Sequence, residues 1–240
     1  MKKICRICVC LVLGLSLVIG VVSLIKKEDY SYYLVMGDYV SKNQIINDKE
    51  ISSFSYLVGE YLKQEEVVNE VNDVYLKNNM TSKKLLEMIE KDSYIEDSSL
   101  VSLIKKSKYI TITLGINDVL NQIKYDSNKN KLIYDKDIIT NKIEIFKHNY
   151  HEIIQEIKNI NNNVNVLLVG CYVVYQDDKL SKNINDAIKE VASENSAYFI
   201  DISDIEDKYM YQENELYLTN LGQEVISSKV ISVIKEIEVI

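Results

Sequence analysis

The Gly-Asp-Tyr segment at residues 37–39 has the form of a turn that presents a side chain for chemistry. A short apolar run at residues 32–36 leads directly into it, and such a run is typical of a buried strand. A strand that ends in a tight turn lifts one side chain out of the sheet, where a nucleophile would be expected. The residue at that position is Tyr39.

Three later segments carry polar residues in a recognisable order. Residues 108–120 run from an apolar strand into Gly115, Asn117 and Asp118, residues 78–82 read Asn-Asn-Met-Thr-Ser, and residues 214–222 read Asn-Glu-Leu-Tyr-Leu-Thr-Asn-Leu-Gly. Together with residues 33–38, these blocks resemble the SGNH (GDSL) hydrolase family of esterases and lipases. The resemblance extends over nearly all of residues 32–240.

The resemblance assigns each position of a catalytic triad. In the family these positions hold a serine nucleophile, an orienting aspartate and a histidine base, and here they hold Tyr39, Asn214 and Tyr217. A phenol titrates near pH 10, and Tyr217 cannot act as the base that would deprotonate it. We therefore expect a family member without an intact triad, in which the Tyr39 and Tyr217 rings pack together and fill the cleft.

The resemblance also implies an oxyanion hole. Its donors would be the backbone N–H groups of Tyr39 and Asn79 and the side chain of Asn117. Two of the three are backbone groups, which a changed side chain need not remove, and asparagine tolerates positive φ at position 79. An equally open alternative is structural: Gly115 permits the turn, and Asn117 or Asp118 caps the next helix.

No other residue is a clear substitute for the missing nucleophile or base. The only histidines, His148 and His151, lie in a segment with helical spacing, and no carboxylates single them out as metal ligands. We interpret them as solvated surface residues and expect no metal or cofactor. Ser41 lies two residues past the turn and should point away from Tyr39, as a residue of a loop or helix cap.

The pattern of apolar residues predicts the fold. Strand-like runs alternate with segments of helical spacing, which favours a three-layer α/β/α sandwich with a five-stranded parallel sheet. The longest predicted helix has an apolar stripe that includes Phe146 and Tyr150, and residues 126–131 read as a polar loop. The expected strands are residues 32–36, 66–71, 109–114, 164–170 and 197–202, and the expected helices are 81–91, 141–159, 180–195 and 221–237.

Residues 1–29 read as an N-terminal signal anchor, and residues 30–240 as one SGNH-hydrolase-like domain. The 19 uncharged residues from Ile7 to Ile25 would span roughly 28 Å as a helix, close to the thickness of a bilayer core. Basic residues precede the span, which predicts a single-pass membrane protein with an extracytoplasmic C-terminal domain.

The charged residues and cysteines of the domain limit the partners and cross-links that we expect. The chain has 28 basic and 36 acidic residues, and five of the basic and two of the acidic ones lie in residues 1–29. The domain therefore has 23 basic and 34 acidic residues and a net charge of −11. Arg6 is the only arginine, and nucleic-acid binding is therefore not expected. Cys171 is the only cysteine after residue 29, so the domain cannot form an internal disulfide.

Three functions are compatible with these residues. The first is a catalytically inactive, membrane-anchored domain that binds an acyl or carbohydrate ligand or an envelope protein. The second is an active esterase for small esters, lipids or acetylated sugars, with a rearranged nucleophile. The third is an assembly protein that uses the fold as a scaffold.

Overall fold

The computed structural model describes residues 31–46, 48–126, 131–172, 178–205, 207–211 and 214–238. Within these ranges no helix is both long and apolar enough to cross a membrane. The predicted anchor, residues 7–25, lies outside the described residues.

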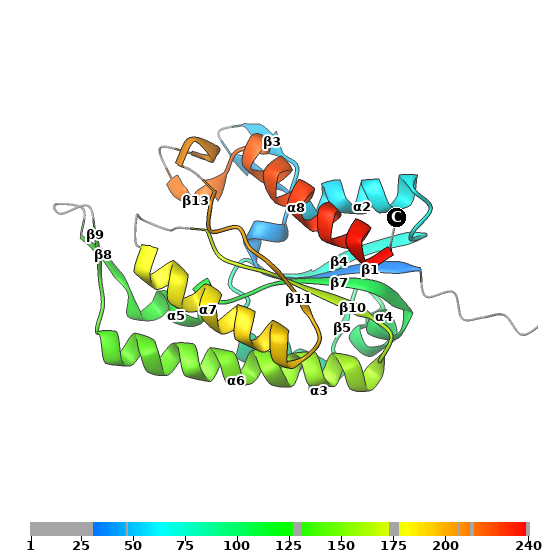
Figure 1. Ribbon diagram of the computed structural model, residues 1–240, viewed down its shortest axis with the longest axis horizontal. Helices are drawn as coiled ribbons and strands as arrows, with labels where there is room; N and C mark the ends of the chain where they lie inside the picture. The colour runs from blue at the N-terminus through cyan, green and yellow to red at the C-terminus, as the bar shows by residue number, and fades with distance from the viewer. Residues whose placement is uncertain are drawn as a thin grey trace, which may run out of the picture.

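A parallel sheet of five strands forms the centre of the domain (Figure 1). Each neighbouring pair is parallel, and the middle strands are almost completely buried, as strands covered on both faces must be. In sheet order the strands are β11 (Tyr198–Ile200), β10 (Asn165–Val169), β7 (Ser107–Thr113), β1 (Tyr32–Gly37) and β4 (Glu70–Leu76).

Helices cover both faces of this sheet, so the predicted three-layer sandwich is confirmed. One face carries α2 (Phe54–Gln64) and α8 (Asn220–Glu238), which contact each other (Figure 1). The opposite face carries α3 (Ser82–Glu90), α4 (Leu100–Lys106), α6 (Lys136–Ile160) and α7 (Asp178–Glu194).

The longest helix, α6, buries the apolar stripe that its sequence predicts. Asp135 caps its N-terminus by accepting from two backbone N–H groups. Phe146 and Tyr150 lie on its buried face, and their rings contact each other with centroids 5.2 Å apart. The tyrosine hydroxyl donates to the carbonyl of Ile112 in β7, which ties the helix to the sheet.

The predicted position of the second strand is wrong. Residues 66–68 belong instead to the turn that ends α2, where Glu66 has φ +55° and the N–H of Val67 donates to Leu62 O. The strand begins at Glu70 and contains an irregularity in its pairing with β1 after Asn72, whose side chain accepts from Val74 N. The prediction depended on the apolar run at residues 66–71, and two of its apolar residues, Val67 and Val68, lie in the turn after α2 rather than in the strand.

Short elements connect the layers. Asp126 and Lys131, predicted to bound a loop, pair in the hairpin of β8 (Lys124–Asp126) and β9 (Lys131–Ile133). The other hairpins are β2 (Gln44–Ile46) with β3 (Lys49–Ile51), β5 (Tyr94–Ile95) with β6 (Ser98–Ser99), and β12 (Met210–Tyr211) with β13 (Asn214–Leu218).

Candidate functional site

The site lies where β1 and β7 end. Gly37, the last residue of β1, has φ +125°, and a Cβ atom there would lie 2.1 Å from the carbonyl oxygen of Thr113. Only glycine fits this close approach of two strands. The chain then turns into the short 3-10 helix η1 (Tyr39–Ser41), with Asp38 as its N-cap accepting from Val40 N at 3.2 Å.

Thr113 holds the turn in place from β7. Its carbonyl and its hydroxyl both accept from the N–H of Asp38, each at 3.1 Å. Its Oγ1 also lies 2.9 Å from Oγ of Ser41, and Ser55 donates to the carbonyl of Ser41. The Ser41 side chain is fully buried, so it supports the turn rather than being presented for reaction.

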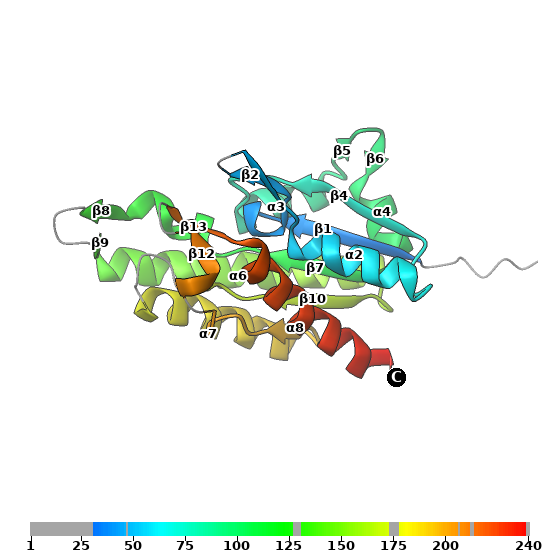
Figure 2. The ribbon, with the colours of Figure 1, turned by 90° about the horizontal axis from the view of Figure 1, so that it is seen from above.

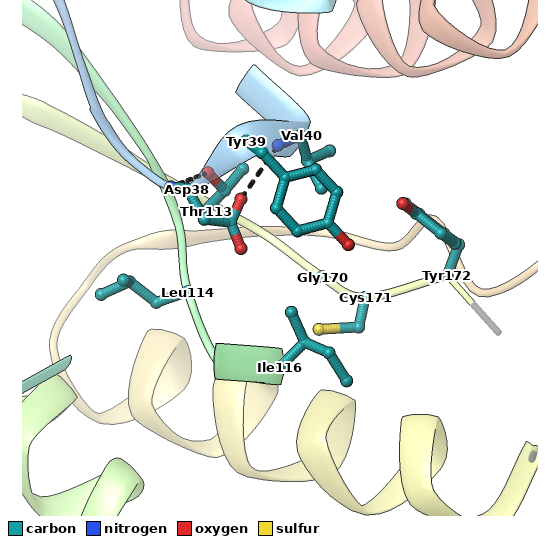
Figure 3. Close-up of a pocket in the computed structure, with 9 residues that line it drawn as sticks. All are labelled: Asp38, Tyr39, Val40, Thr113, Leu114, Ile116, Gly170, Cys171 and Tyr172. Carbon is teal, nitrogen blue, oxygen red and sulfur yellow. Dashed lines mark hydrogen bonds between the residues drawn. The ribbon is translucent and has the colours of Figure 1, made fainter. Parts of the chain in front are cut away.

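Tyr39 and Tyr217 contact each other, as the sequence predicts. The ring centroids are 5.7 Å apart and the planes meet at 65°, a T-shaped contact. The Tyr39 hydroxyl forms a hydrogen bond with Tyr172, and both phenols point into the same space (Figure 3). Burial raises the pKa of Tyr39 above its usual value, so the phenol stays protonated at neutral pH.

A small cavity lies beside the ring of Tyr39. This cavity of about 20 Å³ is lined by residues from the ends of β1, β7 and β10, including Asp38, Tyr39, Ile116 and Cys171 (Figure 3). A volume of this size is comparable with that needed for one water molecule. An acyl ester does not fit into it without movement of the surrounding side chains.

Besides Tyr39 and Tyr172, two more titratable groups line this cavity, the Asp38 carboxyl and the Cys171 thiol. Burial raises the pKa of Asp38 to about 7, although hydrogen bonds from Val40 and Thr113 partly oppose the shift. Burial also raises the pKa of the Cys171 thiol. The backbone of Cys171 is fixed by Asn185 of α7, which accepts from its N–H and donates to its carbonyl, both at 2.7 Å. A protonated thiol is a poor nucleophile.

Two of the three predicted oxyanion donors lie apart from this cavity, whereas the third, the backbone N–H of Tyr39, belongs to a residue that lines it. Neither Asn79 nor Asn117 lines it. The Asn117 side chain donates to the carbonyl of Asn78 at 3.4 Å, and the exposed Asn79 accepts from Lys84 at 3.4 Å. Asn79 does not use positive φ. Their role as oxyanion donors stays a prediction.

Asp118 supports a different helix from the one that the sequence predicts. Its carboxylate accepts from the backbone N–H of Ser82 at 3.0 Å and from the Ser82 hydroxyl at 2.6 Å. It therefore supports the start of α3, and not the helix that follows it in sequence. Burial raises its pKa to about 6, and the hydrogen bonds from Ser82 oppose that shift.

No histidine lies near the tyrosines. His148 is exposed on α6, whereas His151 contacts Gln155 at 2.7 Å and Asn195 at 3.0 Å. Over the described residues, no three His, Cys, Asp or Glu side chains are grouped so that they could hold a metal. The backbone of Asn214 begins β13, three residues before Tyr217.

Sequence reasoning missed Tyr172 and Cys171. Both come just after β10, beyond Gly170. Residues that follow neighbouring parallel strands lie at the same edge of the sheet. That signal is present in the sequence, although neither residue belongs to one of the family blocks.

Comparison with known proteins agrees with this fold. A model of the GDSL-like lipase/acylhydrolase family matches residues 59–225, so the chain belongs to that family. The matched region starts after Tyr39 and includes Asn117 and Tyr217. No curated protein matches the sequence.

Solved structures share the fold at low identity. The lipase Lip_vut3 from a goat rumen metagenome is 19% identical, with a TM-score of 0.67 over 84% of this chain and 96% of that one. A lipase/acylhydrolase from Enterococcus faecalis is 16% identical (TM-score 0.60; 86% and 96% covered). The acetylxylan esterase Axe2 from Geobacillus stearothermophilus is 15% identical (TM-score 0.59; 84% and 93% covered).

Proposed function

We propose that this chain is a non-hydrolytic member of the GDSL-like family, with a binding or scaffold role at the cell envelope. Residues 7–25 would hold it in the membrane as a single span, with residues 30–240 outside the cytoplasm. The partner would be an envelope protein, or an acyl or carbohydrate ligand, and not a nucleic acid.

The contact between Tyr39 and Tyr217 is the observation that carries this proposal. Acyl transfer by this family needs a hydroxyl that a neighbouring base can deprotonate. Here the two aligned positions hold rings that pack on each other, and burial raises the pKa of the Tyr39 phenol rather than lowering it.

Other nucleophiles nearby do not restore the reaction. Ser41 is buried and hydrogen-bonded to Thr113, and the thiol of Cys171 has a raised pKa. Neither contacts a histidine among the described residues, because His148 and His151 both lie on α6 with other partners or exposed to solvent.

The test is hydrolysis by the full-length chain in detergent. We expect no turnover of p-nitrophenyl acetate above buffer and no labelling by a fluorophosphonate probe. A triple variant, Tyr39→Ser with Asn214→Asp and Tyr217→His, is the matched comparison for what the three replacements remove. Wild-type turnover that disappears on Asn117→Ala would instead establish an active esterase and contradict the proposal.

Localisation needs its own measurement. A reporter that is active only outside the cytoplasm, fused after Ile240, should be active in cells. Loss of membrane association when residues 1–29 are deleted should follow. A soluble full-length protein, or an inactive reporter on a stable fusion, would contradict the anchored topology.

A further inference from the structure

A groove of about 390 Å³ lies at the opposite end of the sheet from Tyr39. It contains Tyr32 and Glu70, the first residues of β1 and β4, whereas the tyrosine site follows the last residue of β1. The length of β1 separates the two by roughly 17 Å. In Figure 2, β4, α4 and the β5–β6 hairpin gather at this end of the molecule, away from β12 and β13.

The size and lining of the groove suit a small polar ligand. Its volume falls within the range of sites that enclose small molecules. The sheet, the hairpin and α4 each contribute polar side chains to its wall. They include Tyr32 and Asn72 from the sheet, Tyr94 and Ser98 from the hairpin, and Ser102 and Lys106 from α4.

Several of these groups have hydrogen-bonding capacity to spare. Among the described residues, no hydrogen bond involves the side-chain hydroxyl of Tyr32, Tyr94 or Ser102. The Asn72 side chain accepts from Val74 N, which leaves its amide N–H groups available. Hydroxyl groups can both donate and accept, so a ligand rich in hydroxyl groups could pair with all of them.

The charges of the groove favour a neutral ligand. The carboxylates of Glu70 and Asp97 would repel an anion, and the ammonium of Lys106 would repel a cation. That ammonium lies 5.5 Å from the centroid of the Tyr32 ring, where it already has a favourable contact. No single charge therefore dominates the groove.

Tyr94 offers an apolar surface at the rim. It is 70% exposed although it is a large aromatic residue. An aromatic ring with a free face beside polar side chains suits a ring-shaped ligand that has an apolar face and hydroxyl groups at its edge. We propose that this groove binds a neutral saccharide of one or two sugar rings. The groove shares no residue with the cavity beside Tyr39. The saccharide proposal is therefore independent of the proposed loss of hydrolysis.

Saturation-transfer NMR tests the proposal on the full-length chain, held in a detergent without a sugar headgroup. The probes are maltose, cellobiose and N,N′-diacetylchitobiose at millimolar concentration. At least one should receive saturation from the protein, and Tyr94→Ala should lower that transfer at least fivefold. Tyr56→Ala removes a tyrosine that is 47% exposed on α2 and should leave the transfer within twofold of wild type.

A second variant makes the test independent of Tyr94. Ser102→Leu places an apolar side chain in the groove and should also abolish transfer, with the thermal unfolding temperature checked in parallel. No transfer to any probe, or transfer that survives both groove variants, overturns the proposal. Stronger transfer to glucose 6-phosphate than to glucose overturns the neutral character of the ligand.

Discussion

The ring of Tyr39 meets the ring of Tyr217 edge to face, with the centroids 5.7 Å apart. These residues are 178 positions apart in the chain, and they occupy the two places where the family resemblance puts the nucleophile and the base. An aromatic contact of this geometry adds stability beyond the area that it buries. The two residues thus form a packing interaction at the positions that the family resemblance assigns to a reactive pair.

A double-mutant cycle measures this interaction. Tyr39→Ala and Tyr217→Ala should each lower the free energy of unfolding, and the double variant should lose less than the sum of the two. The coupling energy should be about 0.5–1.5 kcal/mol, as for other aromatic pairs. Urea unfolding of the four proteins gives the values. Strict additivity would mean that the two rings do not stabilise each other.

Tyr39→Phe serves as the control in this cycle. It keeps the ring contact with Tyr217 and removes only the hydrogen bond to Tyr172. The expected loss is about 1 kcal/mol, and coupling to Tyr217 should persist. If Tyr39→Phe removed the coupling, the hydroxyl rather than the ring would carry the interaction.

The neighbours Asn117 and Asp118 should respond very differently to substitution. Asp118→Ala removes the acceptor for two groups of Ser82 at the start of α3, and should lower the free energy of unfolding by about 2 kcal/mol. Asn117→Ala removes one long, exposed hydrogen bond and should change it by less than about 0.5 kcal/mol. Equal losses at the two positions would contradict this division.

Asn117 and Asp118 also show which structural features sequence patterns can predict and which they cannot. The strand that precedes Gly115, and the buried stripe of α6, were predictable because periodicity reflects which face is buried. The partner of Asp118 was not, because Ser82 lies 36 positions earlier and reaches it only through the tertiary packing of α3. The start of β4 was misplaced because the apolar residues Val67 and Val68 lie in the turn after α2, and a short apolar run does not by itself distinguish a strand from other buried structure.

The candidate site shows the same division. The contact between Tyr39 and Tyr217 followed from the family blocks, since these fix which residues meet at one end of the sheet. The hydrogen bond from Tyr172 and the small cavity volume did not, because they depend on side-chain packing. The β5–β6 hairpin, which carries Tyr94 and forms one wall of the groove, has strands of two residues each, too short to give a periodic signal.

Asp38 should make the stability of the protein depend on pH. Burial raises its pKa to about 7, whereas an aspartate in an unfolded chain titrates near 3.9. Between those values the folded state holds a proton that the unfolded state has released. The contribution of Asp38 to stability is therefore fully present below about pH 4 and is lost as the pH rises through about 7, by up to about 1.4 kcal/mol per pH unit.

Asp38→Asn isolates this contribution. An asparagine carbonyl can still accept from Val40 N, so the cap of η1 is retained while the ionisable group is gone. Urea unfolding at pH 4.5, 6 and 8 should show wild-type stability falling more steeply than that of the variant, with the gap largest at pH 8. Asp118, whose pKa burial raises to about 6, titrates in the same direction in both proteins. It cancels in the difference except for its repulsion of the Asp38 carboxylate, which contributes to the raised pKa of Asp38. Asp73→Asn, at an exposed position of β4, should follow the wild-type profile. If the stability of Asp38→Asn also followed the wild-type profile, Asp38 would be ionised in the folded protein throughout this pH range. The prediction of a protonated carboxyl beside Tyr39 would then be wrong.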